Sequence, residues 1–257
     1  MDAVKACALD PLPFADKFAD AARARGFRAE PLTQVAGVPL IAYTKRTPGC
    51  RPRIYISSGI HGDEPAPPGS LLHMLESGLF DDRANWFLCP LLNPTGYRRG
   101  TRENDAGIDL NRDYRDTQSV EIAAHIRWLR RQPRFDLTFC LHEDWETQGF
   151  YLYELNPDNR PSLAGAMVEA AQSHGLIEAA ALIDGRESLV PGIIRPDTEP
   201  LLREQWPEAL YLLQNHCRLG YTVETASITP IEQRVATQHA VVKAALDRFH
   251  LNWPAHR

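Results

Sequence analysis

The segment that most constrains the fold is a near-continuous apolar run from Phe135 to Leu141, FDLTFCL. A strand with one face in solvent alternates apolar and polar residues, whereas this run is apolar almost throughout. Such runs are typical of strands that lie inside a sheet with both faces covered. We therefore expect a central strand here, with helices packed on both sides of its sheet.

Strand-like and helix-like segments alternate along the rest of the chain. Besides two strands joined by a turn near Ala36-Gly37, strands are predicted at Arg53–Ser58, Trp86–Leu92, Gly149–Leu155 and Gly220–Thr225. Apolar residues at helical spacing predict helices at Pro13–Arg25, Gly69–Leu79, Thr117–Gln132, Ser162–His174 and Glu208–Cys217, and a closing helix that reaches Phe249. The alternation predicts a three-layer α/β/α sandwich with a mixed, largely parallel central sheet, as a single domain over residues 1–257.

Three further local features follow from the residue types. Residues 93–115 show neither the helical nor the strand spacing of apolar residues and are therefore predicted to form a long loop. A loop of this length in a compact domain is usually functional or disordered. Residues 185–207 contain four prolines and predict an irregular surface loop or lid. The closing helix is predicted to begin at a capping box, Thr229-Pro230-Ile231-Glu232.

Composition narrows the class of protein. With 257 residues, 44% of them hydrophobic and 24% charged, the chain should be globular. The net charge of -5 argues against general attraction to nucleic acid or to an anionic membrane surface. No run is apolar enough to span a membrane, and Asp10, Asp16 and Asp20 interrupt any secretion signal, so a cytoplasmic protein is expected. Five cysteines without a C-x-x-C pair indicate reduced thiols.

A candidate metal site follows the strand at Arg53–Ser58. In the segment SSGIHGDE, His61 and Glu64 stand three residues apart just after the strand end. An imidazole and a carboxylate on one tight turn can hold a divalent cation, and zinc fits these ligand types. The alternative is a surface turn with a solvated Asp-Glu pair.

Two more polar residues come at the ends of apolar strands, where open α/β sheets place their ligands. His142 follows the run FDLTFCL, and Glu224 ends GYTVE. Each has a structural alternative: a histidine at a strand end is often only hydrogen-bonded, and a strand glutamate is often solvated or ion-paired.

The order of these motifs resembles the zinc carboxypeptidase family, the M14 metallopeptidases. HGDE is followed by NPTGYRRGTRENDAGIDLNRDY, then by a strand that ends in LHE, and then by GYTVET. The resemblance spans roughly Arg53 to Phe249. It implies an amide hydrolase with one zinc ion per chain.

In that family the matching residues bind the metal and activate water. The resemblance implies that His61, Glu64 and His142 bind the zinc and leave a position for water, the pattern of catalytic rather than structural sites. It also implies that Glu224 is the general base, which takes the proton of the water and later delivers it to the leaving amine.

The loop after Asn93 supplies the candidate anion-binding groups. Arg102 matches the family arginine that stabilises the oxyanion. Asn111 and Arg112 match the pair that binds a substrate carboxylate, for which a planar guanidinium is well shaped. Arg98 and Arg99 are interpreted as surface residues.

The chain also departs from the family. Classical carboxypeptidases carry a tyrosine on a mobile loop before the catalytic glutamate, but Tyr211 lies on a predicted helix and is not assigned that role. Glu143 and Asp144, directly after the third ligand, could orient a histidine, repel an anionic side chain or be solvated.

Three functions are compatible with these residues. The first is a zinc-dependent carboxypeptidase-type hydrolase that cleaves an amide bond next to a free carboxylate in a small peptide; HGDEPA resembles the murein peptide amidase branch. The second is an N-acyl amino acid deacylase like succinylglutamate desuccinylase or aspartoacylase, relatives that usually carry an extra C-terminal β-domain. The third is a zinc-binding protein without turnover. The sequence predicts neither the side-chain specificity nor the oligomeric state.

Overall fold

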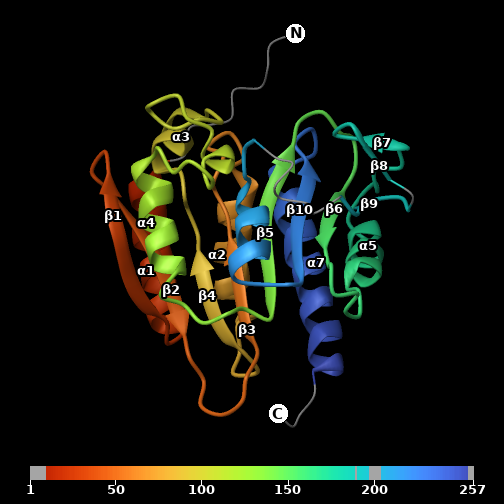
Figure 1. The fold of residues 1–257 in the computed structure, drawn as a ribbon, viewed down its shortest axis with the longest axis horizontal. Coiled ribbons are helices and arrows are strands. Elements are labelled where there is room, and N and C mark those ends of the chain that lie inside the picture. Colours follow the sequence, from red (N-terminus) through yellow and green to blue (C-terminus); the bar gives the residue numbers. More distant parts are fainter. Residues whose placement is uncertain (1–9, 189, 197–203, 254–257) are drawn as a thin grey trace.

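The computed structural model describes residues 10–188, 190–196 and 204–253. Its main element is an eight-stranded sheet with the order β1-β2-β4-β3-β5-β10-β6-β9 (Figure 1). The strands are β1 (Arg28–Val35), β2 (Val38–Lys45), β3 (Arg53–Ser57), β4 (Asn85–Cys89), β5 (Leu137–Asp144), β6 (Tyr151–Leu155), β9 (Ile193–Ile194) and β10 (Gly220–Ala226). At the centre of the sheet β4, β3, β5 and β10 are parallel neighbours. The antiparallel pairs are β1 with β2, β2 with β4, and β6 with β10.

The predicted central strand is β5, and it lies inside the sheet between β3 and β10. All of its residues except the last are buried. Successive side chains enter opposite cores, with Phe139 in the core on one face and Cys140 in the core on the other. Burial on both faces explains why the run contains so few polar residues.

Helices cover both faces of the sheet, as Figure 1 shows. One layer contains α1 (Pro11–Ala24), α2 (Ala66–Glu76), α5 (Ala164–Gln172) and α7 (Ile231–Asn252). The other contains α4 (Val120–Leu129) and α6 (Glu208–Asn215). The predicted α/β/α sandwich with a mixed, mostly parallel sheet is confirmed.

The prediction of a structureless loop at residues 93–115 was wrong. The segment contains the helix α3 (Pro94–Arg99) and the 3₁₀ helix η1 (Leu110–Arg112). Asn93 caps α3, because its Oδ1 accepts the N–H of Gly96 at 2.8 Å, and Gly100 ends it in the left-handed conformation. A helix of six residues is too short to show a period in the sequence.

Three other local predictions also differ from the structure. The capping box does not form, because the Thr229 hydroxyl donates to the carbonyl of Ala226 and no side chain caps α7. The segment predicted as irregular contains β9 and β8 (Arg186–Glu187), which pairs with β7 (Leu182–Ile183); residues 189 and 197–203 lie outside the described residues. Strand β5 does not end before His142 but continues to Asp144.

The hairpin predicted at Ala36-Gly37 is confirmed between β1 and β2. Its two turn residues have φ of 48° and 80°, the positive values that two-residue hairpin turns require. No helix within the described ranges is long and apolar enough to cross a membrane. Cys89, Cys140 and Cys217 are buried free thiols and Cys50 is an exposed one, while Cys7 lies outside the described residues.

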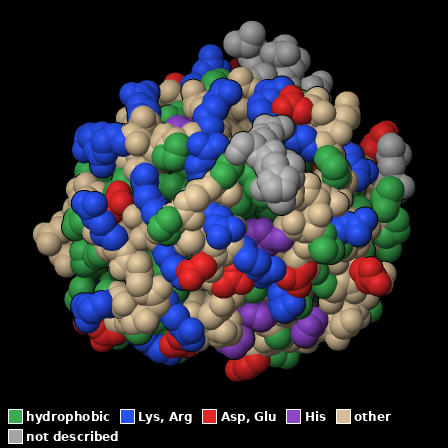
Figure 2. All heavy atoms as spheres, turned by 90° about the horizontal axis from the view of Figure 1, so that it is seen from below, with side chains coloured by type: hydrophobic (Ala, Val, Ile, Leu, Met, Phe, Trp, Pro, Cys, Tyr) green, Lys and Arg blue, Asp and Glu red, His purple; other side chains and the backbone are tan. Residues whose placement is uncertain are grey.

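On the face shown in Figure 2, Lys and Arg side chains are spread widely and outnumber the Asp and Glu side chains in view. The whole chain nevertheless has a net charge of -5. Its charge is therefore distributed unevenly over the surface.

Candidate metal centre

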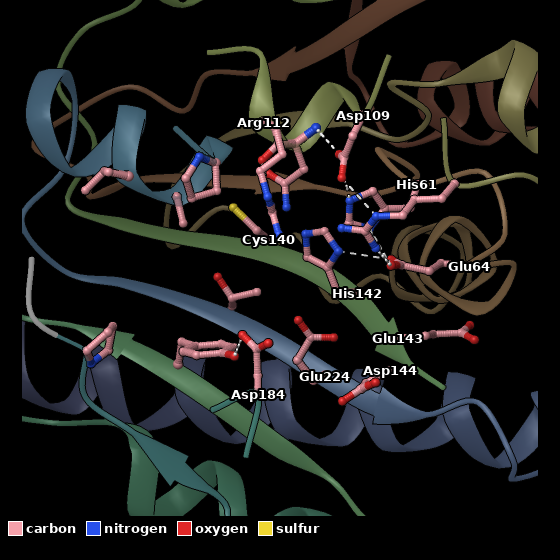
Figure 3. A pocket seen from close by; sticks show the side chains of 18 of the residues that line it. His61, Glu64, Asp109, Arg112, Cys140, His142, Glu143, Asp144, Asp184 and Glu224 are labelled. Carbon is pink, nitrogen blue, oxygen red and sulfur yellow. Dashed lines mark hydrogen bonds and ion pairs between the residues drawn. The ribbon is translucent and has the colours of Figure 1, made fainter. Parts of the chain in front are cut away.

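The candidate residues gather at the carboxyl ends of the parallel strands β3, β5 and β10. A cavity of about 840 Å³ opens there, and Figure 3 shows its lining from close by. The structure brings every predicted site residue to this cavity: His61, Glu64, Arg102, Asn111, Arg112, His142 and Glu224. These residues are spread over the chain from the turn after β3 to the end of β10.

The predicted metal ligands are buried and face one another. His61 Nδ1 lies 2.5 Å from Glu64 Oε1, and His142 Nδ1 lies 3.0 Å from Glu64 Oε2. One potential ligand atom from each residue lies within 4.8 Å of the others. Two imidazoles and a carboxylate form a donor set suited to zinc, and three protein ligands leave a coordination position for water.

The charges of this group are strongly coupled. Burial alone would lower the pKa of His61, but the carboxylates of Glu64 and Asp109 outweigh it and raise the pKa to about 9. Burial alone would raise the pKa of Glu64, but the two neighbouring imidazoles lower it to about 2. The ionised carboxylate of Glu64 is stabilised by positive charge beside it, which either a protonated His61 ring or a bound divalent cation supplies.

Asp109 joins the metal group to the anion-binding groups, a role that was missed although the residue stands in the quoted run GIDLNR. Its Oδ1 lies 3.4 Å from His61 Nε2 and accepts the backbone N–H of Asn111 at 2.9 Å. Its Oδ2 accepts from Arg102 Nε at 2.9 Å. A carboxylate behind a ligand histidine fixes the orientation of the ring.

The other predicted groups surround this trio. Arg102 Nη1 lies 3.3 Å from His61 Nδ1 and 4.0 Å from Glu64 Oε1. Glu224 stands directly beside His142 in the parallel register of β10 and β5. Burial raises the pKa of Glu224 well above its usual range, and the charge of Glu64 raises it further. A carboxyl group with a raised pKa is suited to exchange protons near neutral pH.

Asn111 and Arg112 lie on η1 at the cavity wall. Asn111 Oδ1 accepts the backbone N–H of Glu208 at 2.9 Å, which leaves its amide NH₂ available to a ligand. Arg112 donates from Nη1 to the backbone carbonyl of Asn111 at 2.9 Å, and its side chain extends toward His142 in Figure 3. The pair therefore presents several N–H donors beside the metal group.

Comparison with known proteins decides the family. The catalytic-domain model of the succinylglutamate desuccinylase/aspartoacylase family matches residues 50–249. The chain belongs to this family. No curated protein sequence matches the chain.

Solved structures of metallopeptidases resemble the fold of the chain. A candidate metallopeptidase from Shewanella amazonensis is 25% identical, with a TM-score of 0.80 and 91% of each chain covered. Another from Shewanella baltica is 25% identical, with a TM-score of 0.77 and coverage of 93% of this chain and 90% of that one. A metallo-carboxypeptidase from Burkholderia cenocepacia, at 19% identity, has a TM-score of 0.65 over 91% of this chain and 68% of its own and shares the fold. The resemblance to zinc carboxypeptidases is confirmed, and the family assignment makes the chain a hydrolase.

The wall of the cavity opposite η1 was not predicted. Tyr151 donates to Asp144 at 2.9 Å, and Tyr153 donates to Asp184 at 2.8 Å. Asp184 forms the turn between β7 and β8, where Asp184 and Gly185 have φ of 49° and 66°. This family member therefore has a wall of paired tyrosines and carboxylates. Asp144 and Asp184 of this wall lie beside Glu224 in Figure 3.

The residues left open by the sequence can now be placed. Asp144 lines the cavity and is bound by Tyr151. Glu143 is neither solvated nor free for substrate, because its carboxylate accepts from Arg234 and from the backbone N–H of Ala66. Tyr211 is buried in the core between the sheet and α4, as expected of a helical core residue.

Proposed function

We propose that this hydrolase uses one zinc ion to cleave an amide bond next to a free carboxylate in a small peptide. The observation that carries the proposal is the position of Glu224 beside His142, within a cavity that also contains Asn111 and Arg112. A metal group, a base and a carboxylate-binding pair in one cavity meet the requirements of this reaction.

The metal would be held by His61 and His142 through Nδ1 and by the carboxylate of Glu64, the atoms that face one another in the structure. When bound, zinc lowers the pKa of a water to about 7 and polarises the scissile carbonyl. Asp109 would hold the ring of His61 in the orientation that directs Nδ1 to the metal.

The chain's own residues supply the remaining steps. Glu224 accepts the proton of the attacking water and donates it to the nitrogen of the leaving amine, for which its raised pKa is suited. Arg102 donates hydrogen bonds to the oxygen on which negative charge develops. Asn111 and Arg112 bind the free carboxylate and so place the amide bond between the metal group and Glu224.

The negative charge of the cavity wall favours peptides as substrates over amino acids that carry a dicarboxylic acyl group. Three carboxylates belong to this part of the lining, those of Asp144, Glu146 and Asp184. Arg186 lies there as a cation within 3.9 Å of Asp184. A second carboxylate on the substrate, as in a succinyl group, would be repelled there. Neutral or cationic side chains would be accepted.

A deacylase of N-acyl amino acids is the second candidate, and the family match supports it. The two reactions share the metal, the base and the carboxylate-binding pair, so the substrate separates them. Purified zinc-loaded protein should be offered dipeptides with a free carboxylate, the same dipeptides amidated at that carboxylate, murein tripeptide, and N-acetyl and N-succinyl amino acids.

Cleavage of the free dipeptides but not of their amidated forms is the expected result. Hydrolysis of N-acyl amino acids but of no peptide would show that the protein is a deacylase. Failure to cleave murein tripeptide would exclude a murein amidase activity. Zinc binding without hydrolysis of any compound would indicate a non-catalytic protein.

A further inference from the structure

Helix α7 lies behind the metal centre and contacts it through two residues one helical turn apart. Arg234 forms an ion pair with Glu143, and the side chains are 11% and 0% exposed. Gln238 is fully buried and donates from Nε2 to the backbone carbonyl of His142 at 2.9 Å and to Thr225 Oγ1 at 3.0 Å. Residues four apart share one face of a helix, so one turn of α7 touches both catalytic strands.

The Arg234 contact links the two segments that carry the metal ligands. Glu143 follows the ligand His142, and its Oε1 accepts the N–H of Ala66 at 2.6 Å. Ala66 begins α2 and comes two residues after the ligand Glu64. One buried carboxylate thus connects the strand of His142 to the turn of Glu64, and Arg234 supplies its counter-charge.

The contact of Gln238 with His142 leaves one polar atom of the Gln238 side chain unsatisfied within the part of the chain that the structure describes. Oε1 of Gln238 is buried without a hydrogen-bond partner among the described residues. The carbonyl of His142 can only accept, so the amide must direct Nε2 toward it, and Oε1 then points away from that carbonyl. Both hydrogen bonds of Gln238 therefore go to the strands, one to the backbone of β5 and one to Thr225 of β10.

We propose that Arg234 and Gln238 are positioning residues that set the spacing of His142 and Glu64 and thereby raise the affinity for the metal. The proposal depends on the zinc site described above. Metal ligands need placement to within about 0.2 Å, and contacts behind the ligands supply it. The ladder between β3 and β5 fixes the register of the two strands as far as Ser57 and Cys140. His61 and Glu64 lie beyond the end of β3, so their distance from His142 depends on further contacts.

The test is the zinc dissociation constant of the full chain, measured by competition with a chelator. Gln238→Leu and Arg234→Met should each weaken zinc binding about 10- to 100-fold, with Arg234→Lys affected less. Gln233→Leu is the matched control, because Gln233 lies on the same helix and donates to the His174 carbonyl, away from the site. Its dissociation constant should equal that of the wild type.

Two further measurements separate positioning from stability. In zinc-saturated enzyme the Gln238→Leu variant should keep the wild-type KM, and its cobalt-loaded form should show a shifted absorption spectrum. Gln238→Asn, shorter by one methylene, serves if the leucine variant does not fold. An unchanged zinc affinity and cobalt spectrum with a lower Tm would overturn the proposal. A wild type that binds no zinc would instead overturn the metal site itself.

Discussion

Gly62 and Gly96 pack so closely that a Cβ atom on Gly62 would lie 1.9 Å from the backbone carbonyl carbon of Gly96. The turn that carries His61 and Glu64 therefore lies directly on the backbone of α3. A Cβ atom on Gly96 would in turn lie 2.4 Å from the side-chain amide of Asn93, which caps the helix. Gly62 of HGDE and Gly96 of NPTG are thus both needed for the close contact between the turn of His61 and α3.

Gly62→Ala should displace the metal-binding turn from α3, because no side-chain adjustment relieves a contact with backbone atoms. We expect loss of zinc binding in chelator competition and a lower Tm. Gly165→Ala in α5 is the control, since no atom lies within 4 Å of its added carbon. That variant should keep its zinc affinity and gain about 0.5–1 kcal/mol of stability from the reduced backbone entropy of the unfolded chain.

Glu224→Gln should abolish most of the hydrolysis while zinc binding remains. The amide keeps the shape of the side chain but cannot accept a proton from water, so kcat should fall about 10²- to 10⁴-fold. Steady-state kinetics on the best substrate, with zinc content measured on the same sample, checks this. Residual activity close to the wild type would assign the base to another residue.

Much of the site could be predicted because its residues follow strongly patterned strands. His142 comes after an apolar run typical of an internal strand, and Glu224 lies near the end of β10, a second strand buried along most of its length. The parallel register then places the two side by side. Their proximity depends on the pairing of β5 with β10, a long-range contact that the strand patterns alone do not predict.

The unpredicted parts have weak local signals. Asp184 sits between strands of two residues each, too short to show a period, and it meets Tyr153 from 31 positions away. Arg234 and Gln238 carry no motif, because their role depends on which strands α7 covers. Such contacts are set by packing, and they become visible only when the layers are assembled.

The two site arginines should affect different kinetic parameters. Arg102→Met removes a donor used mainly where charge develops, so kcat should fall about 10²- to 10³-fold. Arg112→Met removes a donor to the substrate carboxylate and should chiefly raise KM. Arg98→Met is the control, because Arg98 is exposed on α3 and does not line the cavity. Equal effects of Arg102→Met and Arg112→Met on KM alone would contradict the separate roles.

A buried histidine away from the metal should make stability fall in acid. His125 lies between two tyrosines, with Tyr114 Oη at 2.7 Å from Nδ1 and Tyr55 Oη at 3.0 Å from Nε2. Tyr55 donates its proton to Glu208, so Nε2 of a neutral ring must donate to Tyr55 while Nδ1 accepts from Tyr114. Burial lowers the pKa of His125 from 6.5 to about 3.

The sign of the pH effect follows from this lowered pKa. Below pH 6.5 the unfolded chain takes up a proton on His125 that the folded chain refuses until about pH 3, so the contribution of the neutral ring to stability decreases across that window. Between pH 7 and pH 4.5 the loss from this residue should be about 2.5 kcal/mol. Urea unfolding of the wild type and of His125→Gln across this range checks it, since other titrating groups cancel in the difference. The stability advantage of the wild type should shrink on acidification; a constant difference would mean that the folded protein binds a proton at this ring.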